Sequence, residues 1–169
     1  SSAGIDGQFY VSIDYGTHNP CSMGLWVIHD GKALRIRESY FDSRKERVQR
    51  TDEEHYTELE RLADGLHVSA IIVDPSAASF IEVIRRHDRY RVEKASNSVL
   101  DGIRNVATRL QSGDIFFCDC CTDCIREFGM YRWDEKAQMD RPIKENDHSM
   151  DDVRYFVHRV YAPDLISFK

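Results

Sequence analysis

An almost uninterrupted apolar segment runs from Ala70 to Val73 and ends at Asp74 and Pro75. A strand that is apolar on both faces must be covered on both sides, as central strands are in sheets flanked by helices. Pro75 lacks the amide hydrogen needed to continue a ladder, so it ends the strand. The segment therefore predicts an α/β fold with a buried central strand and a carboxylate at its end.

The elements around this strand give the order of the fold. Three strand-like segments come first, at residues 9–14, 23–29 and 33–41. Asp30-Gly31 predicts a hairpin turn between the last two, and Thr51 with Glu54 predicts a capping box that starts a helix. Alternating elements follow: strand 69–74, a helix around 80–84, strand 90–95, helix 98–113, strand 115–118, and helices 122–130 and 149–160. The order β-β-β-α-β-α-β-α predicts a mixed central sheet with helices on both faces, in which the first and fourth strands are neighbours.

Size and charge limit the classes of protein that fit. The chain has 169 residues, which suits one domain, and no apolar run reaches membrane-spanning length. We interpret residues 1–7 as a linker or the remnant of an expressed fragment, and 8–169 as one domain of a longer polypeptide. The net charge of −6 excludes nucleic-acid binding through a global basic field. Local basic clusters remain, at 42–50 and at Arg85, Arg86, Arg89 and Arg91.

Carboxylates end the first and the fourth strand, at Asp14 and Asp74. Either one alone is also explained as a residue that starts a turn. The carboxyl ends of neighbouring parallel strands meet at one edge of a sheet, so we expect the two side chains to lie close together. Clustered carboxylates repel one another unless a hard cation such as Mg²⁺ or Mn²⁺ neutralises them. The pair therefore favours a metal site suited to phosphodiester hydrolysis.

A third carboxylate opens the last helix. Asp151 and Asp152 lie in its first turn with Ser149 as the expected N-cap, where the helix dipole alone would favour them. His148 precedes them and either orients a water or leaving group near a metal, or is an exposed loop residue.

Four cysteines, Cys118, Cys120, Cys121 and Cys124, crowd into seven residues. Structural zinc sites need two ligand pairs separated by a dozen or more residues, so this spacing is poor for zinc. We expect the four side chains to act as small buried hydrophobes.

Three segments, "SIDYGT", "IIVDPS" and "WDEKAQMDRPIKENDHSMDDVRY", resemble the C-terminal nuclease domain of the terminase large subunit of tailed double-stranded-DNA phages. The resemblance extends from about residue 8 to residue 160, and the Asp-His-x-x-Asp run at 147–151 is its most specific part. It implies a ribonuclease-H-like, or retroviral-integrase-like, fold.

The resemblance also implies a site and an activity. Asp14, Asp74 and Asp151 would bind two divalent ions, Mg²⁺ or Mn²⁺, with Asp152 as a further metal-ligand candidate and His148 as a catalytic residue. The implied reaction is endonucleolytic cleavage of concatemeric double-stranded viral DNA during packaging, in the cytoplasm of the infected bacterium. The implied partners are an N-terminal ATPase domain of the same polypeptide, the small terminase subunit and the portal protein. For DNA contacts, we predict Arg44, Lys45, Arg47 and Arg50.

Other functions fit parts of the pattern. A Holliday-junction resolvase or a transposase-like nuclease would keep the fold and change the substrate. A non-catalytic packaging adaptor would keep the acidic residues only for turns and helix capping. A zinc-binding module would be built on the cysteine cluster instead.

Overall fold

The computed structural model describes residues 7–16, 20–96, 99–130 and 147–166. Within them, the strands are β1 (Phe9–Asp14), β2 (Cys21–His29), β3 (Lys32–Phe41), β4 (Val68–Val73), β5 (Val92–Lys94) and β6 (Ile115–Phe117). The helices are α1 (Ser43–Glu46), α2 (Asp52–Ala63), α3 (Ala78–His87), α4 (Val99–Gln111), α5 (Thr122–Met130) and α6 (His148–Ile166). For residues 131–146 the sequence predicts a hairpin or an ordered loop, and this segment lies outside the described residues.

The described strands form one mixed sheet in the order β5-β4-β1-β2-β3-β6. The pairs β1–β2 and β2–β3 are antiparallel, and the pairs β1–β4, β4–β5 and β3–β6 are parallel. This confirms the predicted mixed sheet and the predicted neighbourhood of the first and fourth strands. Ile13 pairs with Val73, and the Asp74 amide donates to the Ile13 carbonyl at 3.2 Å. The ends of β1 and β4 therefore meet at one edge.

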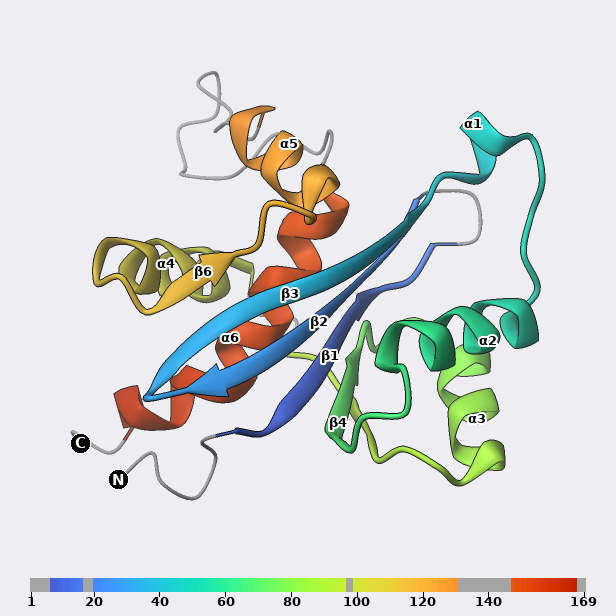
Figure 1. Ribbon diagram of the computed structural model, residues 1–169, viewed down its shortest axis with the longest axis horizontal. Helices are drawn as coiled ribbons and strands as arrows, with labels where there is room; N and C mark the ends of the chain where they lie inside the picture. Colours follow the sequence, from blue (N-terminus) through green and yellow to red (C-terminus); the bar gives the residue numbers. More distant parts are fainter. Residues whose placement is uncertain (1–6, 17–19, 97–98, 131–146, 167–169) are drawn as a thin grey trace.

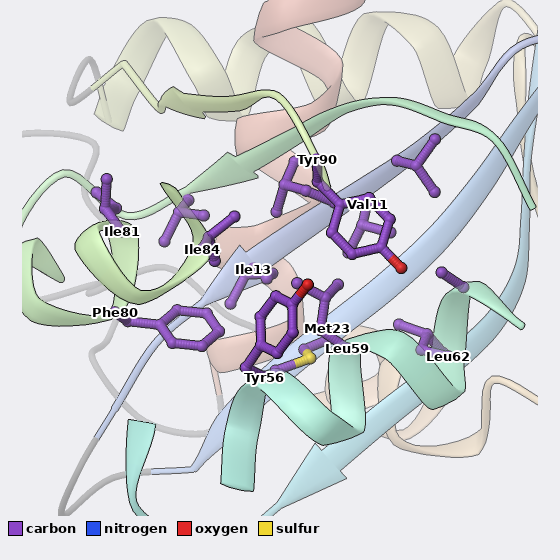
Figure 2. Close-up of a cluster of buried hydrophobic side chains, with 14 of the residues drawn as sticks. Val11, Ile13, Met23, Tyr56, Leu59, Leu62, Phe80, Ile81, Ile84 and Tyr90 are labelled. Atoms are coloured by element: carbon purple, nitrogen blue, oxygen red, sulfur yellow. The ribbon is translucent and has the colours of Figure 1, made fainter. Parts of the chain in front are cut away.

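Helices cover both faces of the sheet (Figure 1). On one face, α2 and α3 pack on Val11 and Ile13 of β1, and Figure 2 shows Tyr56, Leu59 and Phe80 in this core. On the other face, α4, α5 and α6 pack on side chains that include Tyr10 and Trp26. Strand side chains alternate between faces, which is why β1 supplies both cores. Ser12 of β1 therefore faces α6.

Two predicted local features are confirmed. Asp30 and Gly31 take positive φ values of 53° and 74°, as a tight hairpin turn requires. At the start of α2, the Thr51 side chain accepts from the Glu54 amide while the Glu54 side chain accepts from the Thr51 amide. These bonds satisfy two backbone donors that a helix start otherwise leaves unpaired.

Three predictions need correction. The predicted loop before α2 contains the short helix α1, capped by Asp42. The last helix begins at His148, because the Asp151 amide donates to the Asp147 carbonyl, so Ser149 lies inside the helix and is not its N-cap. The apolar pattern of helix 98–113 predicts that Val106, Ala107 and Leu110 enter the core; on α4, Val106 is buried, but Ala107 and Leu110 are exposed.

Candidate active site

A cleft of about 960 Å³ opens where β1 and β4 end and α6 begins. The described residues that line it are Asp14, Tyr15, Gly16, Pro20, Tyr40, Asp42, Arg44, Lys45, Glu46, Asp74, Ser76, Asp123, Arg126, Asp147, His148 and Asp151. The structure therefore brings Asp14, Asp74, Asp151 and His148 to one site from three separate elements.

Asp14 is the most buried of the three acids, with 9% of its surface exposed. Burial raises its pKa to about 7; the hydrogen bond with His148 lowers the pKa, while the charges of Asp151 and Asp74 raise it further. Asp14 Oδ2 lies 3.2 Å from Nδ1 of His148. A cation that joined this carboxylate among its like-charged neighbours would favour its ionised form.

Asp74 and Asp151 also have partners within the protein. Asp74 Oδ1 accepts hydrogen bonds from the backbone amide and the hydroxyl of Ser76, both at 2.9 Å. Asp151 Oδ1 forms an ion pair with Arg154 Nη2 at 3.3 Å. Each of the three acids is therefore held by a different neighbour in this structure.

The donor set fits a hard divalent cation, since carboxylate oxygens are the ligands that Mg²⁺ and Mn²⁺ prefer. The geometry is open. Among the described residues, no three His, Cys, Asp or Glu side chains converge closely enough to hold an ion. Side-chain rotations at the cleft would therefore have to accompany metal binding.

His148 reaches the cleft from the first turn of α6. Burial alone would lower its pKa, but the hydrogen bond and the charge of Asp14 outweigh burial, and the pKa lies above its usual value. The imidazole thus links the start of α6 to the end of β1. Sequence reasoning placed this residue correctly at the site, and its chemical role stays a prediction.

Asp152 does not face the cleft, contrary to its prediction as a metal ligand. Its side chain is fully buried and forms an ion pair with Arg35 of β3. Consecutive helical residues point about 100° apart, so Asp151 and Asp152 cannot share one direction.

The four basic residues predicted to bind DNA divide into two pairs. Arg44 and Lys45 on α1 line the cleft. Arg47 lines a separate, smaller pocket, and the Arg50 guanidinium lies 3.9 Å from the centre of the Phe41 ring. Arg44 lines this smaller pocket as well as the cleft, so of the four predicted residues Arg44 and Lys45 are the two in the cleft lining.

Sequence reasoning missed Arg126 and Tyr40, which line the cleft from α5 and β3. The predicted helix at 122–130 gave no signal for which of its sides would face the site. The described lining carries seven carboxylates and three Lys or Arg side chains, so its charge is strongly negative before any cation binds.

The cysteine cluster is only partly buried. Cys121 and Cys124 are fully buried, as expected, whereas Cys118 is half-buried and Cys120 is exposed. Cys120 and Cys121 donate to the carbonyls of Ile36 and Arg35 at 3.1 and 3.3 Å. The exposed positions belong to the turn between β6 and α5, where side chains cannot all point inward.

Within the described part of the chain, no helix combines the length and the apolarity needed to cross a membrane. No protein-family model matches the chain.

Comparison with known proteins gives consistent matches. The terminase large subunit of Escherichia phage T5 is 26% identical over 157 residues, covering 89% of this chain and 35% of that protein. The large terminase of the thermophilic bacteriophage D6E is 46% identical with a TM-score of 0.87, covering 91% of this chain and 40% of that one. The chain thus spans well under half the length of these relatives.

An isolated domain matches over most of its own length. The nuclease domain of the bacteriophage SPP1 large terminase, solved with bound Mn, is 21% identical with a TM-score of 0.66. The match covers 93% of this chain and 88% of that one. This likeness shows the fold, which is the ribonuclease-H-like fold of terminase nuclease domains. The chain is thus similar in sequence to terminase large subunits and in fold to their nuclease domains.

Proposed function

We propose that this chain is a metal-dependent endonuclease that cuts double-stranded DNA. Within a phage terminase, it would cut concatemeric viral DNA during packaging, and residues 8–169 would form the nuclease domain of a longer polypeptide. The observation that carries the proposal is the meeting of Asp14, Asp74 and Asp151 in one cleft. The nuclease domain of the SPP1 relative, solved with bound Mn, supports the same chemistry.

The protein's residues would divide the work as follows. Asp14, Asp74 and Asp151 would hold the cations, and two ions would suit the three carboxylates. Bound divalent ions would acidify an attacking water and stabilise the charge that develops on the phosphate. His148, fixed by Asp14 at 3.2 Å, would orient the water or the departing oxygen.

DNA would be held through its phosphates. Arg44 and Lys45 on one wall and Arg126 on α5 offer positive charge at the rim of the acidic cleft. Phosphate contacts carry no sequence information directly, so we expect little sequence preference. Because acidic groups outnumber basic ones at the cleft, divalent ions should also be needed for DNA to approach.

The wider setting is inferred from the relatives. The D6E large terminase has been solved in complex with ADP and with ATP-gamma-S. We propose an ATPase domain on the same polypeptide as one partner, and the small terminase subunit and the portal protein as others. The reaction would take place in the cytoplasm of the infected bacterium.

Plasmid nicking tests the function directly. The chain is incubated with supercoiled plasmid in Mn²⁺, in Mg²⁺ or in chelator, beside Asp14→Asn. We expect nicked and linear products only with metal, and none with the variant. Activity in chelator, or a variant as active as the unchanged chain, would contradict the proposal.

A second assay addresses the substrate. Linear duplex and a four-way junction of the same sequence are compared at equal concentration. We expect similar rates on both, whereas a strong preference for the junction would indicate a resolvase.

A further inference from the structure

Two consecutive aspartates at the start of α6 have opposite surroundings. Asp151 lines the acidic cleft, while Asp152 is fully buried behind it. Burying a carboxylate is costly unless donors surround it, so a fully buried acid beside the site calls for an explanation.

Side chains from three different strands satisfy Asp152. Ser12 of β1 donates to its Oδ1 at 2.7 Å, and Ser22 of β2 donates to its Oδ2 at 2.6 Å. Arg35 of β3 donates to both oxygens from its two terminal nitrogens, at 3.1 Å to Oδ2. The start of α6 is therefore bound to β1, β2 and β3 through the Asp152 carboxylate.

The guanidinium of Arg35 is itself held in one place. It is fully buried, lies 5.5 Å from the centre of the Trp26 ring and is 3.6 Å from Glu38. A β-carbon at Gly24 would collide with it, so the fold provides space for this side chain at that position of β2. Trp26 also donates to Ser12 at 2.9 Å, which fixes the orientation of that hydroxyl.

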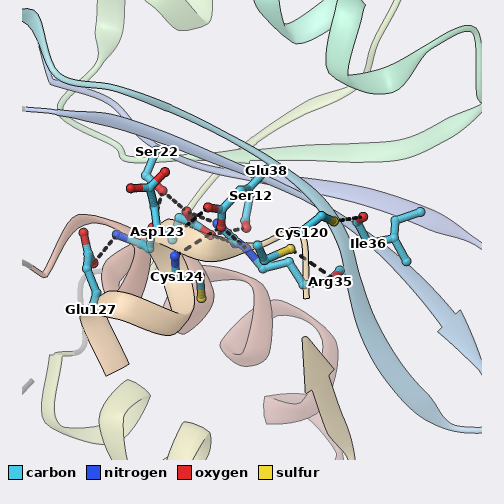
Figure 3. Close-up of polar contacts among 12 residues, drawn as sticks. Ser12, Ser22, Arg35, Ile36, Glu38, Cys120, Asp123, Cys124 and Glu127 are labelled. Carbon is cyan, nitrogen blue, oxygen red and sulfur yellow. Dashed lines mark hydrogen bonds and ion pairs between the residues drawn. The ribbon is translucent and has the colours of Figure 1, made fainter. Parts of the chain in front are cut away.

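Two further carboxylates, those of Glu38 and Glu127, link β3, α5 and α6 around the buried Arg35–Asp152 pair (Figure 3). Glu38 of β3 accepts from the amides of Asp123 and Cys124 at the start of α5, at 2.7 and 3.2 Å. Glu127 of α5 accepts from the amides of Ser149 and Met150 at the start of α6, at 2.7 and 3.2 Å. Strand β3 thus binds α5, α5 binds α6, and α6 binds back to β3.

The contacts of Asp152 also connect α6, which carries Asp151, with the strands next to Asp14. Ser22, which holds Asp152, is the strand partner of Asp14 across β1 and β2. Ser22 and Asp152 therefore help to set the position of Asp151 relative to Asp14, beside the direct contact of His148 with Asp14 and the contact of Ser22 with Ser149. The carboxylates repel one another, so without an ion the start of α6 would tend to move away from β1 unless it is held from behind.

We propose that Asp152 is a positioning residue, whose buried contacts with Arg35, Ser12 and Ser22 fix the first turn of α6 and so present Asp151 to the metals. This inference rests on the proposed function. Residues that orient metal ligands are needed for affinity although they do not touch the ion.

The test measures Mn²⁺ binding by titration calorimetry, beside plasmid nicking. The double variant Arg35→Met/Asp152→Leu replaces the buried pair with apolar side chains of similar size, a change that proteins often tolerate. We expect it to fold and to bind Mn²⁺ roughly 10- to 100-fold more weakly than the unchanged chain. Val106→Ala, which weakens the same core from α4, is the matched control and should keep the unchanged affinity.

Ser22→Ala provides a second test in case the double variant does not fold. It removes one donor to Asp152 and should weaken Mn²⁺ binding by roughly 2- to 10-fold. If the double variant folds, an unchanged Mn²⁺ affinity would overturn this inference. If it does not fold, an unchanged Mn²⁺ affinity of Ser22→Ala would do so. Either result would leave the nuclease proposal standing. If the unchanged chain bound no Mn²⁺, the proposed function would fail, and this inference with it.

Discussion

His148 Nδ1 and Asp14 Oδ2 lie 3.2 Å apart and join the start of α6 to the end of β1. Asp74 is held by Ser76 and Asp151 by Arg154, so Asp14, Asp74 and Asp151 are each bonded to a different neighbour. These contacts stabilise three like charges in one place while leaving the site open. A cation entering the cleft would replace contacts that the protein already makes.

Asp14→Asn should abolish cleavage and stabilise the metal-free fold. The substitution removes a nearly buried negative charge beside Asp74 and Asp151 and keeps the size of the side chain. We expect nicking to fall on the order of 100-fold or more. At pH 8 in chelator, unfolding should cost roughly 1–3 kcal/mol more than for the unchanged chain, as thermal and urea denaturation would measure.

Asp42→Asn is the matched control for this experiment. Asp42 lines the same cleft, and its side chain caps α1 by accepting from the amides of Arg44 and Lys45, a role that Asn also fills. The control should nick at nearly the unchanged rate. Equal losses of activity in both variants would show that cleft charge in general, and not Asp14 in particular, supports cleavage.

Arg44→Ala/Lys45→Ala should weaken DNA binding in a salt-dependent way. Both side chains line the cleft on α1, where they can reach phosphates. Losing two phosphate contacts should reduce the slope of log affinity against log salt by about 2. Fluorescence anisotropy with a labelled duplex in Ca²⁺ would measure the slope.

The comparison for this pair is Arg85→Ala/Arg86→Ala. These arginines are exposed at the end of α3, and neither lines the cleft. Their removal takes away the same number of positive charges and should leave the slope unchanged. A matching fall in slope would mean that DNA binds across the α3 face instead.

The positions of Asp14 and Asp74 could be predicted because they follow from strand order. An apolar strand between helices must lie inside the sheet with a neighbour on each side, and β4 lies between β5 and β1. Helix starts were also predictable where a side chain caps the backbone, as Thr51 and Glu54 do. These features depend on local sequence and on topology.

The different directions of Asp151 and Asp152 were missed, although a signal was present. Asp152 precedes Phe156 by four residues, which places it on the apolar face of α6. Arg35 follows Ala33 by two residues, which places it on the inward face of β3. An acid and a base at inward positions predict a buried ion pair. The roles of Arg126 and Tyr40 had no such signal, because they depend on how α5 packs.

Glu127→Gln should change how stability depends on pH. Burial raises the pKa of Glu127 to about 7, although hydrogen bonds from Tyr40, Met150 and Ser149 lower it. A carboxyl with a raised pKa in the folded state binds its proton more tightly there than in the unfolded chain. Its stabilising contribution is therefore complete below about pH 4.5, the ordinary pKa of a glutamate side chain, and is lost as the pH rises through about 7.

Gln keeps an oxygen that can accept from the two α6 amides and does not titrate. Between pH 4.5 and 8, the free energy of unfolding should therefore fall less for the variant than for the unchanged chain. The difference between the two falls should be roughly 2 kcal/mol. Urea denaturation at several pH values would measure both curves. Parallel curves would show that Glu127 does not contribute to the pH dependence.

Gly24→Ala should destabilise the fold strongly, because a β-carbon there would collide with the guanidinium of Arg35. Arg35 cannot move aside without leaving Asp152 unpaired in the core, so we expect a loss of about 2–4 kcal/mol. Gly129→Ala on α5 is the matched control, since a β-carbon there meets no atom within 4 Å. Alanine suits a helix better than glycine, so the control should be neutral or gain up to about 1 kcal/mol. Chemical denaturation compares the two, and a Gly24→Ala variant as stable as the control would mean that the Arg35–Asp152 pair can shift at little cost.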